Sequence, residues 1–448
     1  MAVIELGLVP SHGDEPAVEP TRRPRHRAEL RRVLVALVAV CCVLTVTGST
    51  RPEPHGLTQL WSVPYSPDAD AYRLVGDALY VLSQNGDRQL TARDIRTGAV
   101  RWSTTAVDDA SWMMTTVEAG VLLMPTSVSM ISRRDPDGTT YSREVSRDTV
   151  AIDTATGRRL WQRPGEFTTA LGDRVLLAEW NETGERARRL RMVRLRDGGT
   201  IWSRDRGDLA SWTTDTTPGT RPDRLVTVTA QGRVEVLALA DGAVVTTGTL
   251  PWPTALGNND YSAVTVQGRR LFLDQTVRDR STVTAYDTET MRRLWAIDQT
   301  TSGGSFGCGP VLCILDGEST SGHDRGTGAR LWRLSGTTSA YPLTNGQLLL
   351  DEDNGTRRAL MDAATGRRLA DLGTGMPVWD STGRATPYLV ARTVQPPGRT
   401  SVSSFDPATG EVTLRGAIPP TLDFGCQYEA DLLVCPTQDN RLLVTDVG

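Results

Sequence analysis

The stretch Asp94-Ile95-Arg96-Thr97-Gly98-Ala99-Val100-Arg101-Trp102 contains a spacing, Asp-x-x-Thr-Gly-x-x-x-Trp, that recurs along the chain. The intact and degenerate copies are marked by Asp94, Gly98 and Trp102; Asp153, Gly157 and Trp161; Gly198 and Trp202; Gly242; Asp287 and Trp295; Asp324, Gly328 and Trp332; Asp362 and Gly366; and Asp406 and Gly410. Successive tryptophan-type positions lie about 37 to 59 residues apart, with a mean near 44. Periods of this length are typical of propellers and solenoids.

The two ends of the chain carry the two halves of one more copy. Trp61 has no Asp or Thr-Gly before it, and Asp446 has no room for a tryptophan after it. Joined, the halves complete a repeat, so the pattern predicts a ring closed by both termini.

Each unit has the same internal order. A run that is apolar on both faces, such as Val121–Met124, precedes a polar turn and a second strand that ends at the Asp. Such runs indicate strands covered on both sides. The Asp can accept backbone hydrogen bonds in a tight turn, and the Gly allows a positive φ. The tryptophan then fills the gap between adjacent sheets. We therefore expect a structural role for Trp61, Trp102, Trp161, Trp202, Trp295 and Trp332.

The predicted fold is all-β: a β-propeller of eight or nine four-stranded blades over residues 57–448, preceded by one N-terminal transmembrane helix. Counting hairpins favours nine blades, one above the usual range. The units around Gly198 and Gly242 are the weakest copies, which leaves eight open.

This pattern resembles the tryptophan-docking repeat of the pyrroloquinoline-quinone-like propeller superfamily. The resemblance implies the fold and not the activity, because the superfamily includes quinoprotein alcohol dehydrogenases as well as the non-catalytic, BamB-like lipoprotein scaffold of bacterial outer-membrane assembly. The dehydrogenases carry adjacent cysteines over the cofactor. Here the only adjacent pair, Cys41 and Cys42, precedes the repeats, so we expect no cofactor and no enzymatic activity.

The N-terminal region indicates a membrane anchor. Residues 1–32 are predicted to form a disordered cytoplasmic tail, 33–50 an uncharged transmembrane signal anchor, and 51–56 a linker. Six arginines between Arg22 and Arg32 predict a cytoplasmic N-terminus and an extracytoplasmic propeller. A cleaved signal peptide and a lipid-modified cysteine are the alternatives.

Four cysteines lie in the repeats: Cys308, Cys313, Cys426 and Cys435. They occupy equivalent places in two units, which favours the pairs Cys308–Cys313 and Cys426–Cys435 as disulfides. Free buried thiols are the alternative, and a zinc site is less favoured because the two segments are separated around the ring.

Catalytic and metal-binding patterns are sparse. His323 is the only histidine of the propeller, and a solvated turn histidine explains it better than a Ser/His/Asp triad. Two acidic loops, Asp135–Gly138 and Asp351–Gly355, lack the full spacing of calcium sites. No metal ligand or catalytic residue is predicted, and a net charge of −4 gives no reason to expect nucleic-acid binding.

Two stretches are candidates for recognition: the long loop of residues 132–147, and the run Arg186, Arg188, Arg189, Arg191, Arg194 and Arg196. Exposed structural segments would have the same composition.

We expect a membrane-anchored scaffold that binds an unknown envelope protein or cell-wall ligand. The alternative is a small-ligand sensor or a quinone-dependent oxidoreductase that uses the central channel.

Overall fold

The computed structural model describes residues 57–83, 88–107, 110, 116–134, 140–184, 186–215, 221–253, 260–278, 280–299, 304–317, 319–343, 345–381, 385–422 and 425–448. The chain divides into two units, Met1–Glu53 and Pro54–Gly448, and all described residues belong to the second. The predicted tail, transmembrane segment 33–50 and linker lie outside the described residues. Within the described part of the chain, no helix is long and apolar enough to cross a bilayer.

All regular elements of the described residues are β-strands, and most sheets are antiparallel meanders in chain order. Five sheets have four strands each. They are β2 (Asp70–Val75), β3 (Ala78–Ser83), β4 (Gln89–Asp94) and β5 (Val100–Thr104); β6 (Thr116–Glu118), β7 (Val121–Arg134), β8 (Thr140–Asp153) and β9 (Arg159–Pro164); β17 (Tyr261–Gln267), β18 (Arg270–Val277), β19 (Arg280–Asp287) and β20 (Arg293–Gln299); β21 (Ser305–Cys308), β22 (Val311–Leu315), β23 (Ser319–His323) and β24 (Arg330–Ser335); and β25 (Thr337–Pro342), β26 (Gln347–Glu352), β27 (Arg357–Asp362) and β28 (Arg368–Gly373).

Two larger sheets complete the unit. A seven-stranded sheet contains β10 (Glu166–Leu171), β11 (Arg174–Trp180), β12 (Ala187–Arg194), β13 (Thr200–Thr214), β14 (Arg224–Thr229), β15 (Arg233–Ala238) and β16 (Val244–Thr249). An eight-stranded sheet contains β1 (Thr58–Pro64), β35 (Arg441–Asp446), β34 (Leu432–Thr437), β33 (Gln427–Glu429), β29 (Met376–Trp379), β30 (Ala385–Arg392), β31 (Thr400–Phe405) and β32 (Val412–Ile418), in that spatial order.

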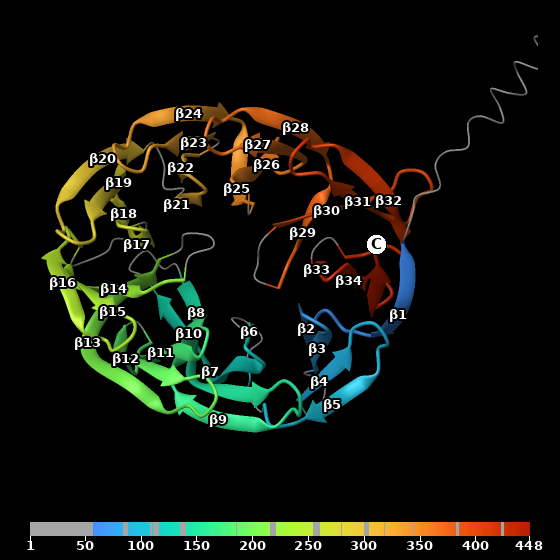
Figure 1. Ribbon diagram of the computed structural model, residues 1–448, viewed down its shortest axis with the longest axis horizontal. Coiled ribbons are helices and arrows are strands. Elements are labelled where there is room, and N and C mark those ends of the chain that lie inside the picture. Colours follow the sequence, from blue (N-terminus) through green and yellow to red (C-terminus); the bar gives the residue numbers. More distant parts are fainter. Residues whose placement is uncertain are drawn as a thin grey trace, which may run out of the picture. The chain divides into compact units, whose positions relative to one another are not determined.

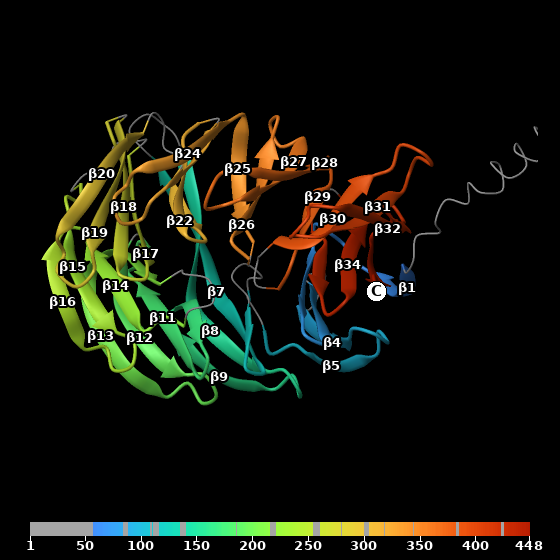
Figure 2. The same ribbon diagram turned by 45° about the horizontal axis from the view of Figure 1, so that its top comes forward.

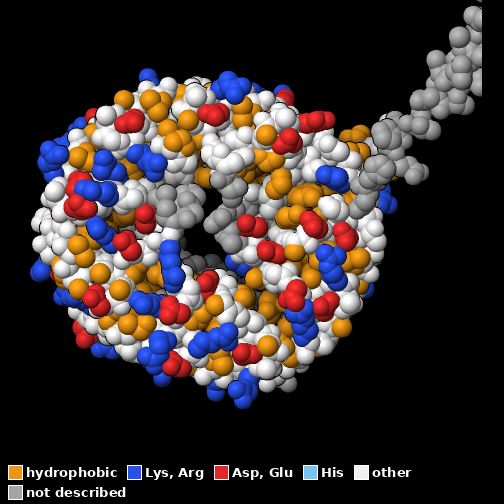
Figure 3. Space-filling model, in the orientation of Figure 1, with side chains coloured by type: hydrophobic (Ala, Val, Ile, Leu, Met, Phe, Trp, Pro, Cys, Tyr) orange, Lys and Arg blue, Asp and Glu red, His pale blue; other side chains and the backbone are white. Residues whose placement is uncertain are grey.

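The sheets follow one another around a propeller-like ring. In Figure 1 the first strand of each group of four lies toward the centre and the last lies at the rim. The space-filling view shows that the ring is hollow at its centre, with basic and acidic side chains interspersed on this face (Figure 3). The expected all-β, propeller-like architecture is therefore confirmed for the described residues.

Each large sheet has a point at which two groups of strands join. In the seven-stranded sheet, the first part of β13 pairs with β12 and its last residues, Leu209–Thr214, pair with β14. One strand thus serves two groups without an intervening loop. In the eight-stranded sheet, the only pairing between β29 and β33 is the parallel pair Trp379 and Gln427.

The split repeat closes as expected. Strand β1 pairs antiparallel with β35, in a register that runs from Thr58 opposite Asp446 to Pro64 opposite Arg441. An ion pair, Arg96 Nη1 to Asp446 Oδ2 at 3.2 Å, links this sheet to the next one. The N-terminal and C-terminal strands of the repeat region therefore share one sheet.

Buried apolar side chains fill the junctions between neighbouring groups of strands, in nine clusters among the described residues. One cluster contains Leu74 and Leu79 of β2 and β3 together with Leu432 and Leu442 of β34 and β35. This cluster joins the first complete sheet to the sheet that holds both termini. Apolar packing thus continues around the ring without interruption.

The motif tryptophans lie across these junctions. Six of them donate the indole N–H to the backbone oxygen of the residue that follows the Asp-type position of the next repeat. The bonds are Trp61 to Ile95 (2.7 Å), Trp102 to Thr154 (2.7 Å), Trp161 to Leu195 (2.7 Å), Trp202 to Leu239 (2.9 Å), Trp295 to Arg325 (3.1 Å) and Trp332 to Ala363 (2.9 Å).

The glycine of the next repeat makes room for each ring. Gly157 has φ +70°, and a Cβ atom there would lie 2.5 Å from Cε3 of Trp102. Gly98, Gly198, Gly242, Gly328 and Gly366 face Trp61, Trp161, Trp202, Trp295 and Trp332 in the same way. The motif therefore connects two repeats: the turn of one receives the tryptophan of the repeat before it.

We predict that Gly157→Ala destabilises the protein much more than Gly76→Ala. Both positions have positive φ, which costs a side chain about 1–2 kcal/mol. Only Gly157 lies against a tryptophan, since a Cβ at Gly76 meets no atom within 4 Å. Displacing Trp102 should add about 1–3 kcal/mol. Urea unfolding followed by tryptophan fluorescence measures the difference, and equal losses in the two variants would contradict this docking role.

A buried carboxylate lies at another junction. Asp274 of β18 is 5% exposed and accepts a hydrogen bond from the Ser305 hydroxyl at 2.7 Å. Burial raises the pKa of this carboxyl from 3.8 to about 6. Because the folded pKa lies above the unfolded value, the stability that this group contributes is present below about pH 4 and is lost as the pH rises through 6.

Asp274→Asn should therefore stabilise the protein at pH 8, by up to about 3 kcal/mol, and have little effect at pH 4. Urea unfolding at pH 4, 5, 6 and 8 tests this difference. The exposed Asp298, replaced by Asn in the same way, is the control. A stability difference that does not change with pH would rule out ionisation of Asp274 as its cause.

Candidate functional site

The first recognition stretch extends one hairpin of the ring. Strands β7 and β8 pair from Val121 opposite Asp153 to Arg134 opposite Thr140. Their neighbours are shorter, because β6 pairs only with Val121–Leu123 and β9 only with Asp148–Ile152. The upper part of the hairpin therefore continues beyond its own sheet, as the long strands in Figure 2 show.

This extension packs against the neighbouring sheet. Val145 is fully buried in a cluster with Trp180 and Ala187, and Ile131 packs against the same cluster. Gly184, in the turn between β11 and β12, lies directly against the Ile131 side chain. The extension thus lies beside the strand that carries the second recognition stretch, the arginine run of β12.

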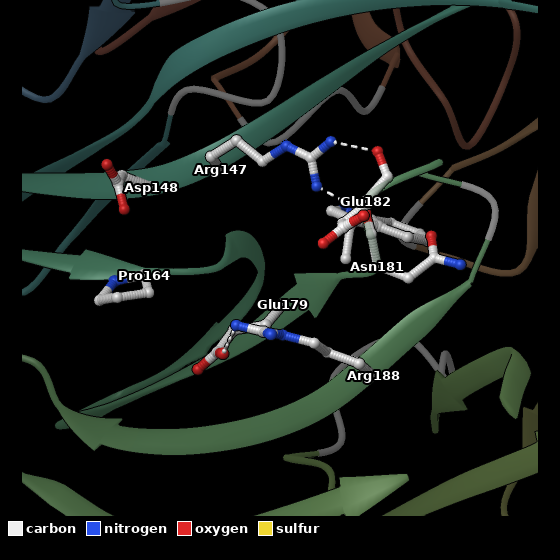
Figure 4. Close-up of a pocket in the computed structure, with 8 residues that line it drawn as sticks. Arg147, Asp148, Pro164, Glu179, Asn181, Glu182 and Arg188 are labelled. Atoms are coloured by element: carbon white, nitrogen blue, oxygen red, sulfur yellow. Dashed lines mark hydrogen bonds and ion pairs between the residues drawn. The ribbon is translucent and has the colours of Figure 1, made fainter. Parts of the chain in front are cut away.

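A cleft opens where the two stretches meet. Its cavity volume is about 570 Å³, and its lining residues are Arg147, Asp148, Pro164, Glu179, Trp180, Asn181, Glu182 and Arg188. In Figure 4, Asp148 and Pro164 lie on one side of the open space, Glu179 and Arg188 on another, and Arg147, Asn181 and Glu182 around its far end. Strands β8, β9, β11 and β12 all contribute to this site.

Glu179 is the electrostatic centre of the cleft. Its side chain is only 5% exposed, yet three arginines bind it. Arg191 Nη2 lies 2.5 Å from Oε1, while Arg188 Nη2 and Arg189 Nη1 lie 3.3 and 3.4 Å from Oε2. Arg189 also pairs with Asp205 across the strand, and this contact lowers the pKa of the Asp205 carboxyl. A buried carboxylate needs such partners, because an unpaired charge there would be costly.

Backbone contacts hold the far end of the cleft. The guanidinium of Arg147 donates to the backbone oxygens of Asn181 and Glu182, at 2.6 and 2.9 Å. The Trp180 indole donates to Glu166 Oε2 at 3.0 Å, and the same oxygen accepts the backbone N–H of Ser146 at 3.1 Å. The hairpin extension and the β11–β12 turn are therefore joined by direct hydrogen bonds as well as by apolar packing.

Most arginines of the run have an acidic partner within the chain. Besides the three arginines on Glu179, Arg194 pairs with Asp197 and Arg196 pairs with Asp153. Arg186 lies in the β11–β12 turn, where its backbone pairs with that of Asn181. The run thus forms ion pairs of mixed charge and not a uniformly basic surface.

The sequence of the repeats matches a known protein family. A family model described as outer membrane protein assembly factor BamB, of the pyrroloquinoline-quinone repeat type, matches residues 53–204 and 186–323, which together make up more than half of the chain. The chain belongs to this family. A search of curated proteins gave no match.

Solved structures similar to the chain have various functions. BamB from Moraxella catarrhalis is 13% identical over 87% of this chain and 99% of its own, with a TM-score of 0.46. A eukaryotic initiation factor is 10% identical over 78% of this chain and 88% of its own, with a TM-score of 0.50. A europium-containing methanol dehydrogenase is 13% identical over 86% and 84%, with a TM-score of 0.38. At such identities the likeness concerns the fold alone.

The aspartates of the family motif bind their own turns. Carboxylates of Asp94, Asp153, Asp287, Asp324, Asp362 and Asp406 accept hydrogen bonds from the threonine hydroxyl three residues later. Gly410, in the turn of Asp406, lies against Ala370, which stands in the place of a tryptophan. These residues therefore belong to the ring and not to the cleft.

The four cysteines of the repeats form two disulfides, Cys308–Cys313 and Cys426–Cys435, with Cα atoms 5.8 and 4.3 Å apart. The first disulfide joins β21 to β22. The second joins the residue directly before β33 to β34.

The expectation of a solvated turn histidine is wrong, because His323 lies on strand β23 in the interior. It is 5% exposed, and its ring nitrogens lie 3.0 Å from the Ser321 hydroxyl and from the Gly328 backbone oxygen. Burial lowers the pKa of the imidazole. The Asp324 carboxylate bonds to the Thr327 N–H and hydroxyl, so these contacts do not form a Ser/His/Asp relay.

Of the two acidic loops, the structure describes only Asp351–Gly355. Asp351 pairs with the buried Arg358, Oδ1 to Nε at 2.6 Å, while the loop Asp135–Gly138 lies outside the described residues. In the described ranges, no three His, Cys, Asp or Glu side chains gather as metal ligands.

Sequence reasoning named both recognition stretches but missed Glu179 and its neighbours. A signal was present: Glu179 follows the apolar run Val175–Ala178 on a strand covered on both faces. An acid in such a row requires cationic partners, and the nearest were the arginines of the following strand.

We predict that Glu179→Gln destabilises the protein by about 2–3 kcal/mol, because Arg189 and Arg191 lose the buried charge that they face. Arg188→Ala should cost at most about 1 kcal/mol, since Arg188 is 62% exposed and two arginines still bind Glu179. Chemical unfolding of both variants measures these losses. A larger loss for Arg188→Ala than for Glu179→Gln would contradict the central place of Glu179.

Proposed function

We propose that this chain is a membrane-anchored, extracytoplasmic scaffold that binds a protein of the envelope and performs no catalysis. The observation that carries the proposal is the cleft, because it is built from the two stretches that extend or decorate the common repeat. Membership in a family described as an assembly factor supports the same reading. Loops on one face of a rigid ring are a usual place for partners to dock.

The proposal includes the location. Residues 33–50 would anchor the chain with a cytoplasmic N-terminus, as the basic cluster before them favours. Two disulfides in the repeats support an extracytoplasmic ring, since such bonds persist in oxidising compartments. A reporter enzyme that is active only outside the cytoplasm, fused after residue 56, should be active; an inactive fusion would reject this topology.

We also propose that the ring has nine blades. Support comes from the pairing pattern: if β13 counts in two groups and the eight-stranded sheet is divided between β29 and β33, every group has four strands. The nine apolar clusters agree with nine junctions. An experimental structure of residues 57–448 with any other number would overturn this count.

Site-specific crosslinking tests the scaffold function. A photoreactive amino acid at Glu182, an exposed residue of the cleft lining, should capture one reproducible envelope protein in cells. The same group at Leu331, which is 53% exposed on β24, is the matched control and should not capture it. Capture at both positions alike, or at neither, would contradict the cleft as the binding site.

A thermal-shift measurement tests the alternative, a quinone-dependent enzyme. Pyrroloquinoline quinone with calcium must raise the melting temperature if it binds the native state selectively. We expect no shift. A clear shift together with dye-coupled oxidation of an alcohol would replace the scaffold proposal.

A further inference from the structure

We propose that the cleft recognises an extended peptide segment of its partner through one acidic side chain, which binds the guanidinium of Arg188. This inference rests on the proposed binding function and names the chemistry of the partner at the same site. Three observations lead to it: the exposure of Arg188, the excess of arginine around Glu179, and the acids on the other walls.

Arg188 is the most exposed of the three arginines on Glu179. Its side chain is 62% exposed, against 34% for Arg189 and 16% for Arg191. A guanidinium has five N–H donors. Among the described residues, the only bond found for the Arg188 guanidinium is its single 3.3 Å contact with Glu179 Oε2. Donors in the planar arrangement that suits a carboxylate therefore remain available at the cleft.

Glu179 does not depend on Arg188. Arg191 makes the shortest contact, 2.5 Å to Oε1, and Arg189 also reaches Oε2. Arg188 can therefore turn from Glu179 to an incoming carboxylate while the buried charge keeps two partners. The rearrangement requires only one exposed side chain to change rotamer, and the backbone of β12 can stay in place.

The other walls select against a polyanion. Asp148 lies on another side of the cleft and Glu182 at its far end, so a chain of repeated phosphates or carboxylates would meet repulsion from both (Figure 4). A peptide segment with one acidic residue between basic or polar residues matches a cleft that has the cationic Arg188 together with the acidic Asp148 and Glu182. For this reason we favour a peptide over an anionic cell-wall polymer. The arginine run by itself would suit either ligand.

The size and position of the cleft agree with a short segment. A volume of about 570 Å³ lies within the range of pockets that enclose small ligands. The cleft lies between two sheets held together by Arg147 and by the Val145 cluster, so its walls are already in place. A preformed site of this kind requires little ordering on binding.

Selection from a random library of linear dodecapeptides displayed on phage tests the inference. Full-length protein serves as target, and peptides that also bind the Arg188→Glu variant are removed. We expect the remaining peptides to share one Asp or Glu beside Lys, Arg or polar residues. In a synthetic version of a selected peptide, exchange of that acid for its amide should weaken binding at least tenfold.

Arg188→Ala should weaken binding of the same peptide at least tenfold, whereas Arg280→Ala should leave it unchanged. Arg280 is 73% exposed and pairs with Asp298, so it is a matched arginine away from the cleft. An acid-to-lysine exchange in the peptide should restore binding to the Arg188→Glu variant. Melting temperatures of all variants show whether each is folded.

Several outcomes would overturn the inference: no peptide that depends on Arg188, selected peptides without an acid, or tighter binding of polyglutamate than of the selected peptide. These results can be separated from a failure of the scaffold function. If the Glu182 crosslink to the envelope partner persists in Arg188→Ala, the cleft binds a partner but not through this anchor.

Discussion

The ring depends on one repeated contact, a tryptophan of one repeat seated over the glycine turn of the next. The contact combines three requirements: an indole N–H that reaches a turn carbonyl, a glycine with positive φ that leaves room for the ring, and an Asp whose carboxylate holds that turn. Trp102 and Gly157, which lie 55 residues apart in sequence, meet these requirements. Because six repeats each place a tryptophan on the turn of the following repeat, the contact orders most of the groups around the ring.

Where the motif is incomplete, the backbone adds other connections. The units around Gly198 and Gly242 lack the Asp, and there the single strand β13 passes from one group into the next without a loop. Leu414 replaces a tryptophan in β32 and is 55% exposed, and its group of strands is joined to the following one through the pair Trp379 and Gln427. Loss of the motif Asp in the first place, and of the tryptophan in the second, thus coincides with hydrogen bonding between groups of strands.

The fold could be predicted from the sequence because it depends on local, repeated features. The spacing of Asp94, Gly98 and Trp102 was enough to anticipate strands, turns and closure by the two ends. The continuity of β13 could not be anticipated, because Gly207 and Asp208 are turn-type residues that suggest a connection between two strands. The cleft was also beyond sequence reasoning: the convergence of Arg147, Glu179 and Arg188 depends on how the β7–β8 extension leans on the next sheet.

The cleft becomes distinctive when it is compared with equivalent places in other sheets. An acid follows the apolar run of the second strand in three groups, at Glu179, Asp274 and Asp351. Burial raises the pKa of Asp274, which bonds a serine hydroxyl, and also that of Asp351, which faces one buried arginine and a tyrosine.

Those two sites therefore accommodate the acid within the interior, with few partners and little exposed charge. At Glu179 the same position has more arginines than the carboxylate requires, and one of them is largely exposed beside an open volume. A requirement of stability alone would be met by Arg189 and Arg191. Packing does not explain the additional arginine, Arg188, because its strand β12 is already held to its neighbour. Recognition of an acidic group would explain its presence.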